Sequence, residues 1–469
     1  MLRSYKIILA ILLSASQIAA QTMSLDSSFA VLENQPNQPY SILPLNDGRY
    51  YVGGGSDFSQ ILGNKIVRVL NDGQIDPTFV SQHFFNSAIL SVDTTSNGDV
   101  IVGGIMYPYR IVKLNSEGQV DAQFQSNLNS SFDDIVEVVK VQPDGKILVG
   151  GQFDYFNFTP VNRLARLNAD GTLDESFNVT TGFLYSQVIP THIECLPDGK
   201  ILVAKRYDDG SSFPYAGICR LNEDGSIDPT FQSPLNTGSV TALTKLSNGK
   251  YLLGGFQMHI GNLEEFDLHL VRIDANGIPD TAFQFQSDAL SHNIDYVKGL
   301  YEMDENNVVM VYSSTSNYRI KPILVNDVGG FDTTLISVEG FDNDVFCSAI
   351  DFDGKILVGG SYYYFDTTLR LGVTRFIYDG SSTGITEVSS GKRINVFPNP
   401  TDGQLYFDFG TADPKAIKAD LVDALGNRVS IVELGNSSPL DVSELVSGIY
   451  CLVPIASSEV FAPITFIKK

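Results

Sequence analysis

The 469-residue chain has no tryptophan, only five histidines and four cysteines, and far fewer basic than acidic residues. The histidines are scattered singly and no Cys-x-x-Cys occurs, so a zinc site is not expected. Basic residues number 31 against 54 acidic ones, giving a net charge of −23 without any basic run. Because phosphate binding needs clustered lysine and arginine, this balance argues against nucleic acid and anionic membranes as partners.

A nine-residue string recurs along most of the chain. It reads PDGKILVGG at Pro143–Gly151, and its copies are spaced by 47 to 58 residues. The copies lie at Asn46–Gly54, Ser96–Gly104, Pro143–Gly151, Pro197–Lys205, Ser247–Gly255, Glu305–Ser313 and Phe352–Gly360. Seven copies at a nearly fixed period predict a repeat architecture.

A second motif keeps step with the first and reads RLNADGTLDESF at Arg166–Phe177 and RLNEDGSIDPTF at Arg220–Phe231. The last copy, Arg375–Gly380, stops before its Asp-x-x-Phe, whereas Leu25–Phe29 reads LDSSF with no first half before it. One unit is therefore split between the two ends of the repeat region. A closed ring explains the split, because an open solenoid needs capping repeats at its ends instead.

The local chemistry of each unit favours short strands. Asp-Gly and Asn-Gly are typical of tight hairpin turns, and each unit has two of them. The run between them, such as KILVG, is apolar at consecutive positions, which predicts a strand buried on both faces. About four short strands in roughly 50 residues are typical of a propeller blade. We therefore expect an all-β fold: a seven-bladed β-propeller over residues 21–380, closed by its N-terminal strand.

The DGKILVGG and RLNxDGxxDxxF strings resemble the delta-60 repeat, a β-propeller repeat of unassigned activity in bacterial surface and secreted proteins. The resemblance covers about Leu25–Gly380 and implies the architecture without implying a reaction. Sialidase-like propellers carry Asp-box turns that end in tryptophan, which this chain lacks.

Residues 1–20 have the pattern of a secretory signal peptide. Arg3 and Lys6 precede an apolar core at Ile7–Leu13, and small residues precede Gln21, so cleavage is expected after Ala20. The alternative, a membrane anchor, needs about 20 apolar residues, and this run is shorter. The sequence therefore predicts export, with no transmembrane segment in the mature chain, and the acidic charge suits solubility outside the cell.

The four cysteines are at positions 195, 219, 347 and 451. By alignment to the repeat, Cys195 and Cys219 fall on the first and third strands of one blade, about 9–10 Å apart and beyond disulfide reach. Cys451 lies in a different domain. Buried free thiols are the favoured interpretation, although an exported protein could form bridges.

After the repeats, Ser381–Lys392 is rich in glycine, serine and threonine and reads as a linker. Residues 393–469 contain short strands with closely spaced turns, which predict a small Ig-like β-sandwich. This segment resembles the C-terminal type A sorting domain of the type IX secretion system of Bacteroidetes. The matching residues are Phe397, Pro398, Asn399, Pro400, Asp423, Gly426, Asn427, Leu445, Gly448, Ile449, Tyr450, Lys468 and Lys469. The resemblance implies that this domain engages the secretion machinery and that the product is released or attached to the outer-membrane surface. The alternative is an accessory module that binds a ligand itself.

The two Asp-Gly turns of each unit should lie on one face of the ring, which leaves the longer, variable loops on the other face. Those loops are rich in tyrosine and phenylalanine, and such residues on a rigid scaffold are typical of contact surfaces. The predicted contact residues are Tyr107, Tyr109, Tyr155, Phe156, Tyr207, Tyr215, Tyr362, Tyr363 and Tyr364. The alternative is that these rings only plug the channel mouth and cover the blade edges. An extracellular glycan or protein would be the partner.

Two further possibilities stay open at this stage. Asn168, Asp170 and Asp174, and likewise Asn222, Asp224 and Asp228, cluster oxygen atoms that calcium could use. The spacing is too short for an EF-hand, and an Asx-type turn is the favoured explanation of these residues. No cofactor is predicted. A polysaccharide-active enzyme, a hydrolase or lyase with carboxylates on the variable face, is the alternative to a binding protein, because an acidic chain always offers some carboxylate pair. No catalytic residue is assigned.

Overall fold

A computed structural model describes residues 22–29, 38–55, 65–81, 85–179, 188–207, 217–260, 268–285, 294–314, 320–332, 335, 340–379, 395–397, 401–408, 417–423, 428–434, 439–454 and 464–469. Residues 20–380 form one compact unit, and residues 381–469 belong to a second. The predicted signal peptide and the predicted linker lie outside the described residues.

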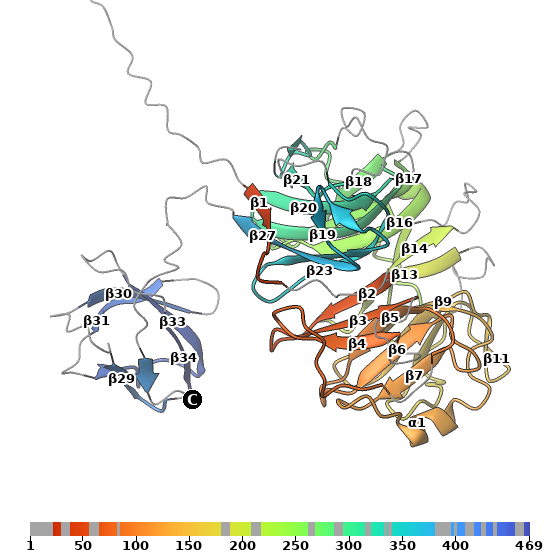
Figure 1. Cartoon of the computed structure of the whole chain (residues 1–469), viewed down its shortest axis with the longest axis horizontal. Helices are drawn as coiled ribbons and strands as arrows, with labels where there is room; N and C mark the ends of the chain where they lie inside the picture. Colours follow the sequence, from red (N-terminus) through yellow and green to blue (C-terminus); the bar gives the residue numbers. More distant parts are fainter. Residues whose placement is uncertain are drawn as a thin grey trace, which may run out of the picture. The chain divides into compact units, whose positions relative to one another are not determined.

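The repeat region, residues 20–380, is built from antiparallel sheets that follow one another along the chain, one for each repeat (Figure 1). The first sheets are β2 (Pro39–Pro44), β3 (Tyr50–Gly54), β4 (Ile66–Val69); β5 (Ile89–Thr94), β6 (Val100–Gly104), β7 (Ile111–Leu114); and β8 (Val136–Val141), β9 (Ile147–Gly151), β12 (Leu164–Leu167). Next come β13 (Val188–Cys195), β14 (Ile201–Tyr207), β15 (Gly217–Leu221); and β16 (Leu235–Lys245), β17 (Tyr251–Ile260), β18 (Leu268–Ile273). The last two are β19 (Tyr296–Asp304), β20 (Asn307–Ser313), β21 (Ile323–Asn326), β22 (Phe331–Asp332); and β23 (Val345–Ile350), β24 (Ile356–Gly360), β27 (Val373–Asp379), β1 (Thr22–Leu25). This is an all-β, propeller-like fold.

The second strand of each sheet is the buried one, as its unbroken apolar run predicts. All five residues of β3, β6, β9 and β24 are buried. The paired glycines that end these strands allow the neighbouring sheet to approach. A Cβ on Gly103 would lie 2.5 Å from Val136 Cγ1 on the next sheet, and a Cβ on Gly104 would lie 2.2 Å from the carbonyl oxygen of Ala88. Side chains at these positions would therefore force neighbouring strands apart.

The first strands of successive sheets contact one another in a cycle. Contacts join β2 to β5, β5 to β8, β8 to β13, β13 to β16, β16 to β19, β19 to β23, and β23 back to β2. Side chains of the first and last of these sheets also share one buried core, in which Ile42 and Val52 pack with Ala349 and Leu357.

The fourth strand is shorter than the sequence predicts in most units. In the first sheet it is reduced to a single bridge between Val69 and Ile75, and four other units have the equivalent bridge. The chain turns away directly afterwards because the next aspartate, Asp76 in this unit, caps a turn through Thr78. In the second unit a six-residue helix, α1 (Ala122–Asn127), replaces this turn, and its N-cap is the corresponding aspartate, Asp121.

The segment after the predicted signal peptide completes the seventh sheet, as the split repeat predicts. β1 pairs antiparallel with β27, and Leu25 lies opposite Phe376. Figure 1 shows β1, in red, beside β27, in blue, although the two strands are about as far apart in sequence as the repeat region allows.

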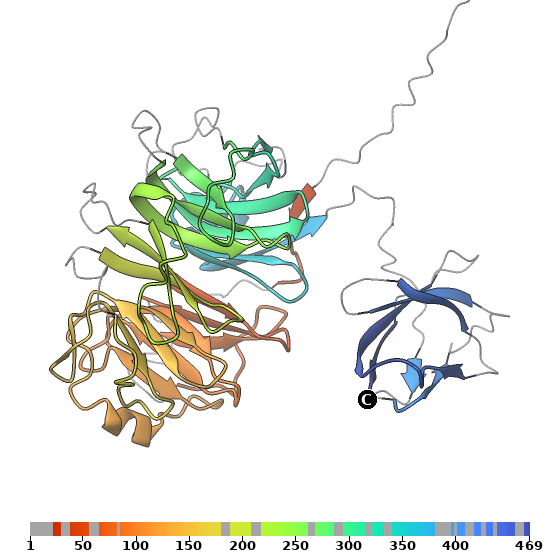
Figure 2. The same ribbon diagram turned by 180° about the vertical axis from the view of Figure 1, so that it is seen from behind.

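The C-terminal unit contains two antiparallel sheets. One consists of β28 (Asn395–Phe397), β29 (Gln404–Asp408) and β32 (Leu440–Asp441), and the other of β30 (Ile417–Asp423), β31 (Arg428–Leu434), β33 (Gly448–Pro454) and β34 (Ile464–Lys468). Both sheets contribute to one buried core that includes Leu405, Phe407, Leu421 and Leu452. Figure 2 shows the strands of this unit from behind.

Candidate functional site

Two kinds of connection lie at opposite ends of each sheet: short turns at one end and longer loops at the other. The Asp-Gly and Asn-Gly turns join the first strand to the second and follow the third, so the antiparallel pairing places both at one end. Gly48 in the first of these turns has φ +83° and donates its N–H to the carbonyl of Leu45. The longer loops between second and third strands lie at the opposite end, which we call the variable-loop face.

The structure divides the predicted contact residues into exposed and buried groups. Tyr107, Tyr155, Tyr363 and Tyr364 are 72%, 46%, 43% and 45% exposed. Phe158, which the sequence reading did not select, is 83% exposed.

Three predicted residues are buried or half-buried. Phe156 and Tyr362 are buried, so including them in a contact surface was wrong. Tyr109 is half-buried and packs against the cores of the second and third sheets. Tyr207 ends β14, with its side chain outside the described residues, and Tyr215 lies outside them altogether.

Two matched hairpins explain this division. In the third unit, Asp133 Oδ1 accepts hydrogen bonds from the N–H groups of Asp154 and Tyr155. This fixes a hairpin between β10 (Tyr155–Phe156) and β11 (Thr159–Pro160), in which Phe156 packs on Phe132 with ring centroids 4.8 Å apart. Neighbouring residues therefore point to opposite sides, Phe156 inward and Tyr155 outward.

The seventh unit repeats this arrangement. Asp342 Oδ1 accepts from the N–H groups of Tyr363 and Tyr364, and Phe341 packs against Tyr362 and Phe365. The hairpin joins β25 (Tyr364–Phe365) to β26 (Thr368–Leu369). In each of the two aromatic loops, some rings therefore pack into the core and others are exposed to solvent.

A cavity that the sequence reading missed lies where the first strands meet. Its volume is about 420 Å³, and we call it the axial pocket. It is lined by Tyr40, Thr191, Arg206, Thr241, Tyr296, Lys298, Phe346, Cys347 and Ser348. Most of these residues stand near the beginning of a first strand, and Arg206 stands near the end of a second strand, so the pocket lies at the variable-loop end of the sheets.

Polar contacts define the chemistry of the axial pocket. Arg206 Nη2 lies 2.8 Å from Glu137 Oε1. Lys298 Nζ lies 5.2 Å from the centroid of the Tyr296 ring, a cation–π distance. Burial lowers the pKa of Lys298, with Cys347 and Asp344 acting in the opposite direction and Arg206 adding to the decrease. An alignment of the repeats would have placed most of these residues at similar positions of their first strands, so the sequence did contain a signal for the pocket.

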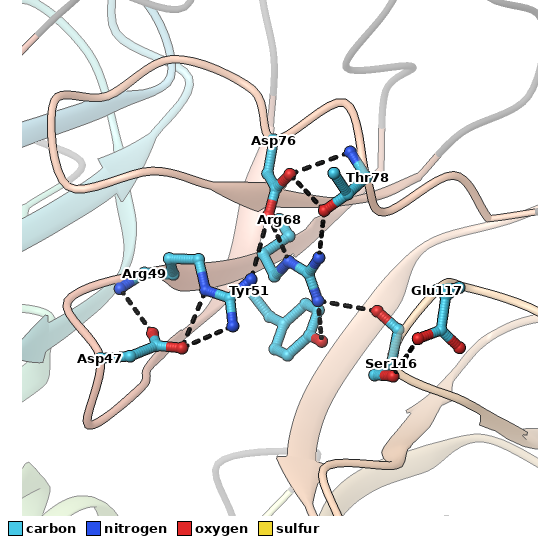
Figure 3. Close-up of polar contacts among 8 residues, drawn as sticks. All are labelled: Asp47, Arg49, Tyr51, Arg68, Asp76, Thr78, Ser116 and Glu117. Atoms are coloured by element: carbon cyan, nitrogen blue, oxygen red, sulfur yellow. Dashed lines mark hydrogen bonds and ion pairs between the residues drawn. The ribbon is translucent and has the colours of Figure 1, made fainter.

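The repeated arginine and aspartate of the second motif form a buried clamp at the turn end (Figure 3). Arg68 Nε donates to Asp76 Oδ2 at 2.7 Å, and Nη2 donates to Thr78. Arg68 Nη1 donates to the carbonyl of Ser116 in the next sheet's turn, and the guanidinium lies 5.4 Å from the centroid of the Phe79 ring. The motif residues therefore join one sheet to the next.

The same clamp recurs in other units. Equivalent pairs are Arg166–Asp174, Arg220–Asp228, Arg272–Asp280 and Arg375–Asp26. The last pair joins the two ends of the repeat region: Arg375 Nη1 donates to the carbonyl of Asn71 in the first unit, and its guanidinium lies over Phe29 at 4.5 Å. Burial alone would raise the pKa of Asp26, but hydrogen bonds from Ser28 and Arg375 lower it to about 2.

The candidate calcium ligands are engaged in contacts within the chain. Asp170 Oδ1 accepts from the N–H of Thr172 at 3.0 Å, which is an Asx-type turn. Asp174 pairs with Arg166 and with Lys146. These contacts favour the turn interpretation of both residues.

Several predicted sorting residues can be located. Tyr450 is buried and donates its hydroxyl to the carbonyl of Val446. Gly448 lies opposite Lys468 in the β33–β34 pair, and Asp423 lies opposite Tyr450 in the β30–β33 pair. Lys468 is buried, and the N–H of Lys469 donates to Thr401. Pro398, Asn399, Pro400 and Gly426 lie outside the described residues.

The predicted cysteine geometry is also found, because β14 separates the strands that carry Cys195 and Cys219, and the thiols of Cys195, Cys219 and Cys347 are free. Of these three, only Cys347 is buried as predicted; Cys195 and Cys219 are half-buried. The Cys451 side chain lies outside the described part. Within the ranges given above, no helix has the length and hydropathy that a membrane crossing requires.

Comparison with known proteins finds a matching family model in each of the two parts of the chain. A family described as a domain of unknown function (DUF5122) β-propeller matches residues 45–79, 142–177, 196–231 and 353–381. A secretion system C-terminal sorting domain matches residues 395–462. No curated protein matches the sequence.

Solved structures with similar folds include the WD40 β-propeller domain of Doa1 (13% identity, TM-score 0.49), which the match covers completely along with 78% of this chain. Another is the extracellular domain of the hybrid two component system BT3049 from B. thetaiotaomicron (14% identity, TM-score 0.47), where 96% of this chain matches 57% of that one. A third is a luciferin-regenerating enzyme (10% identity, TM-score 0.37; 77% of this chain and 96% of that one).

Proposed function

Because this chain carries DUF5122 β-propeller repeats and a secretion-system C-terminal sorting domain, which implies secretion, we propose that it is an exported interaction protein. Its variable-loop face binds an extracellular ligand, either a glycan or a protein. The observation that carries the proposal is the set of exposed tyrosines on that face whose backbone N–H groups are hydrogen-bonded to an aspartate, Tyr155, Tyr363 and Tyr364.

The scaffold we propose is a ring of seven blades that its N-terminal strand closes. Support comes from the clamp: Arg375 reaches the turn of the first unit in the same way that Arg68 reaches the turn of the second. The cyclic contacts of the first strands and the shared core of the first and last sheets point the same way. Such a ring holds its loops in fixed positions, which lowers the entropic cost of binding.

We assign export to residues 393–469, as an Ig-like domain that engages the type IX machinery after removal of residues 1–20. The product is then released or attached to the outer-membrane surface. Deleting residues 393–469 should leave the repeat unit folded but retained inside the cell envelope, as measured by fractionation. Normal appearance of the truncated protein outside the cell would contradict this role.

The binding assignment is tested by replacing Tyr155, Tyr363 and Tyr364 together with alanine. The matched control replaces Ile227, Ile278 and Phe352, which are exposed at the turn end. Binding to a glycan array and to the surface of producing cells should be lost in the tyrosine variant alone, while both variants keep the parent Tm within a few degrees.

Two results would argue against the proposal. If the tyrosine variant bound as well as the control variant, the variable-loop tyrosines would not form the contact surface. Release of reducing sugar from a polysaccharide would favour the alternative, a polysaccharide-active enzyme with carboxylates on that face.

A further inference from the structure

We infer that the axial pocket binds the carboxylate-bearing ring of an acidic sugar, a uronic acid. This assignment rests on the proposed function, because it names a ligand class for a site at the variable-loop end of the sheets. It depends on three features of the pocket walls: a cation, a set of hydrogen-bond acceptors and aromatic rings.

The cation is Lys298, on the first strand of the sixth sheet. Its ammonium group makes no ion pair among the contacts of the described part of the chain, and the charges of Cys347 and Asp344 only partly offset the burial that lowers its pKa. Arg206 adds a second positive charge, although Glu137 shares it. An ammonium group in a partly buried site is stabilised by an anionic ligand, and a carboxylate accepts its hydrogen bonds directly.

The acceptors are threonine hydroxyl groups whose protons are already used. Thr191 Oγ1 donates to the carbonyl of Val240 at 2.7 Å, and Thr241 Oγ1 donates to the carbonyl of Val297 at 2.7 Å. A hydroxyl has one proton and two lone pairs, so each oxygen can still accept a hydrogen bond from a ligand. A ligand that fits must therefore donate hydrogen bonds as well as carry a negative charge, as the hydroxyl groups of a sugar acid do.

The aromatic walls suit a ring-shaped ligand. Tyr40 and Phe346 stack on each other at 4.9 Å between centroids, and Tyr296 is 41% exposed. The negative face of an aromatic ring attracts the C–H groups of an apolar ring face. A cavity of about 420 Å³ lies within the range of pockets that hold small ligands.

The test is calorimetric titration of the purified full chain with glucuronate, glucose and benzoate. Glucuronate should bind more tightly than either of the other two, because glucose lacks the carboxylate and benzoate lacks the hydroxyl groups. Lys298→Met should weaken glucuronate binding about tenfold or more, the usual effect of losing a charge-assisted hydrogen bond. Lys298→Arg, which keeps the charge, should retain most of the affinity.

The matched control is Lys245→Met, an exposed lysine at the turn end of β16. It should leave glucuronate binding unchanged, and circular dichroism should show each variant folded. Three outcomes would overturn the inference: no glucuronate binding by the folded protein, glucose or benzoate binding as tightly as glucuronate, or an affinity that Lys298→Met does not change. If one of these outcomes is found but the array still shows binding that the triple tyrosine variant loses, the proposed function stands without this ligand. Loss of tyrosine-dependent binding with glucuronate binding retained would refute the contact surface instead.

Discussion

The clamp between the two ends of the repeat region allows a quantitative prediction for Asp26→Asn. Asp26 is 3% exposed and pairs with Arg375 Nη2 at 2.7 Å, with Lys355 at 3.4 Å. The substitution removes the negative charge but leaves the buried guanidinium in place. Breaking a buried ion pair in this way costs about 3–5 kcal/mol, because the remaining charge is not compensated.

This cost can be converted into a change of Tm. Unfolding entropy is about 2.1 cal/mol/K per residue, which for residues 20–380 amounts to about 0.8 kcal/mol/K. A loss of about 3–5 kcal/mol therefore lowers the Tm of the repeat unit by about 4–6 °C. Differential scanning calorimetry of the parent and the variant measures this shift.

Two controls separate the clamp from general effects of a charge change. Asp228→Asn breaks the equivalent pair inside the repeat region, with Arg220, and should cost the same amount. Asp47→Asn breaks a pair in which Asp47 is 50% exposed, and such surface pairs contribute about 0–1 kcal/mol. If Asp26→Asn lowered the Tm no more than Asp47→Asn does, the two ends of the repeat region would not be joined by a buried pair and the reasoning would be refuted.

Three other predictions concern the pH dependence of stability, the reactivity of a thiol and the effect of calcium. The hydrogen bond from Lys250 lowers the pKa of Asp280 to about 2, although burial alone would raise it. The pKa of Asp26 is likewise about 2 because of its own partners, and both pKa values should be near 3.9 in the unfolded chain. Their stabilising effect is thus complete above about pH 4 and is lost as pH falls toward 2, so Tm measured against pH should drop there and drop less in Asp280→Asn. Burial raises the pKa of the Cys347 thiol to about 12, so this thiol should resist thiol reagents at pH 8 until denaturant is added, as peptide mass spectrometry would show; rapid labelling of Cys347 in the native protein would contradict the burial. Calcium and chelator should leave the Tm unchanged, because Asp170 and Asp174 already hold partners within the chain, and a calcium-dependent rise would restore the metal interpretation.

The sequence predicts the repeat scaffold well because its turns and strands depend on local chemistry. Gly48 requires a positive φ, and the KILVG run predicts a strand buried on both faces; both are found. The split unit could be recognised because Arg375 lacks its aspartate and Asp26 lacks its arginine, and the two meet. The ion pair could also have been suspected from the sequence, because arginine and aspartate recur eight residues apart. That spacing alone does not show which atoms are in contact.

The candidate site was harder to predict because it depends on which way single side chains point. Tyr155 and Phe156 are adjacent in sequence, yet one is exposed and the other is buried, since a strand alternates its faces. The axial pocket combines residues such as Tyr40, Thr191 and Lys298 from strands that are far apart in the chain. Composition and single motifs do not bring these residues together. Only an alignment of the first strands across the repeats does.

The opposite ends of the sheets carry different kinds of residue, and this separation can itself be tested. The motif residues, such as Asp228, form clamps at the turn end, whereas Lys298 lies at the variable-loop end and shares no contact with that clamp. The effects of substitutions that share no partners add within about 0.5 kcal/mol. The double variant Asp228→Asn, Lys298→Met should therefore show the Tm loss of the first change and the binding loss of the second, each as large as in the single variants. Calorimetry and titration of all four proteins would measure both quantities, and a coupling well above that limit would mean that the two ends do not act independently.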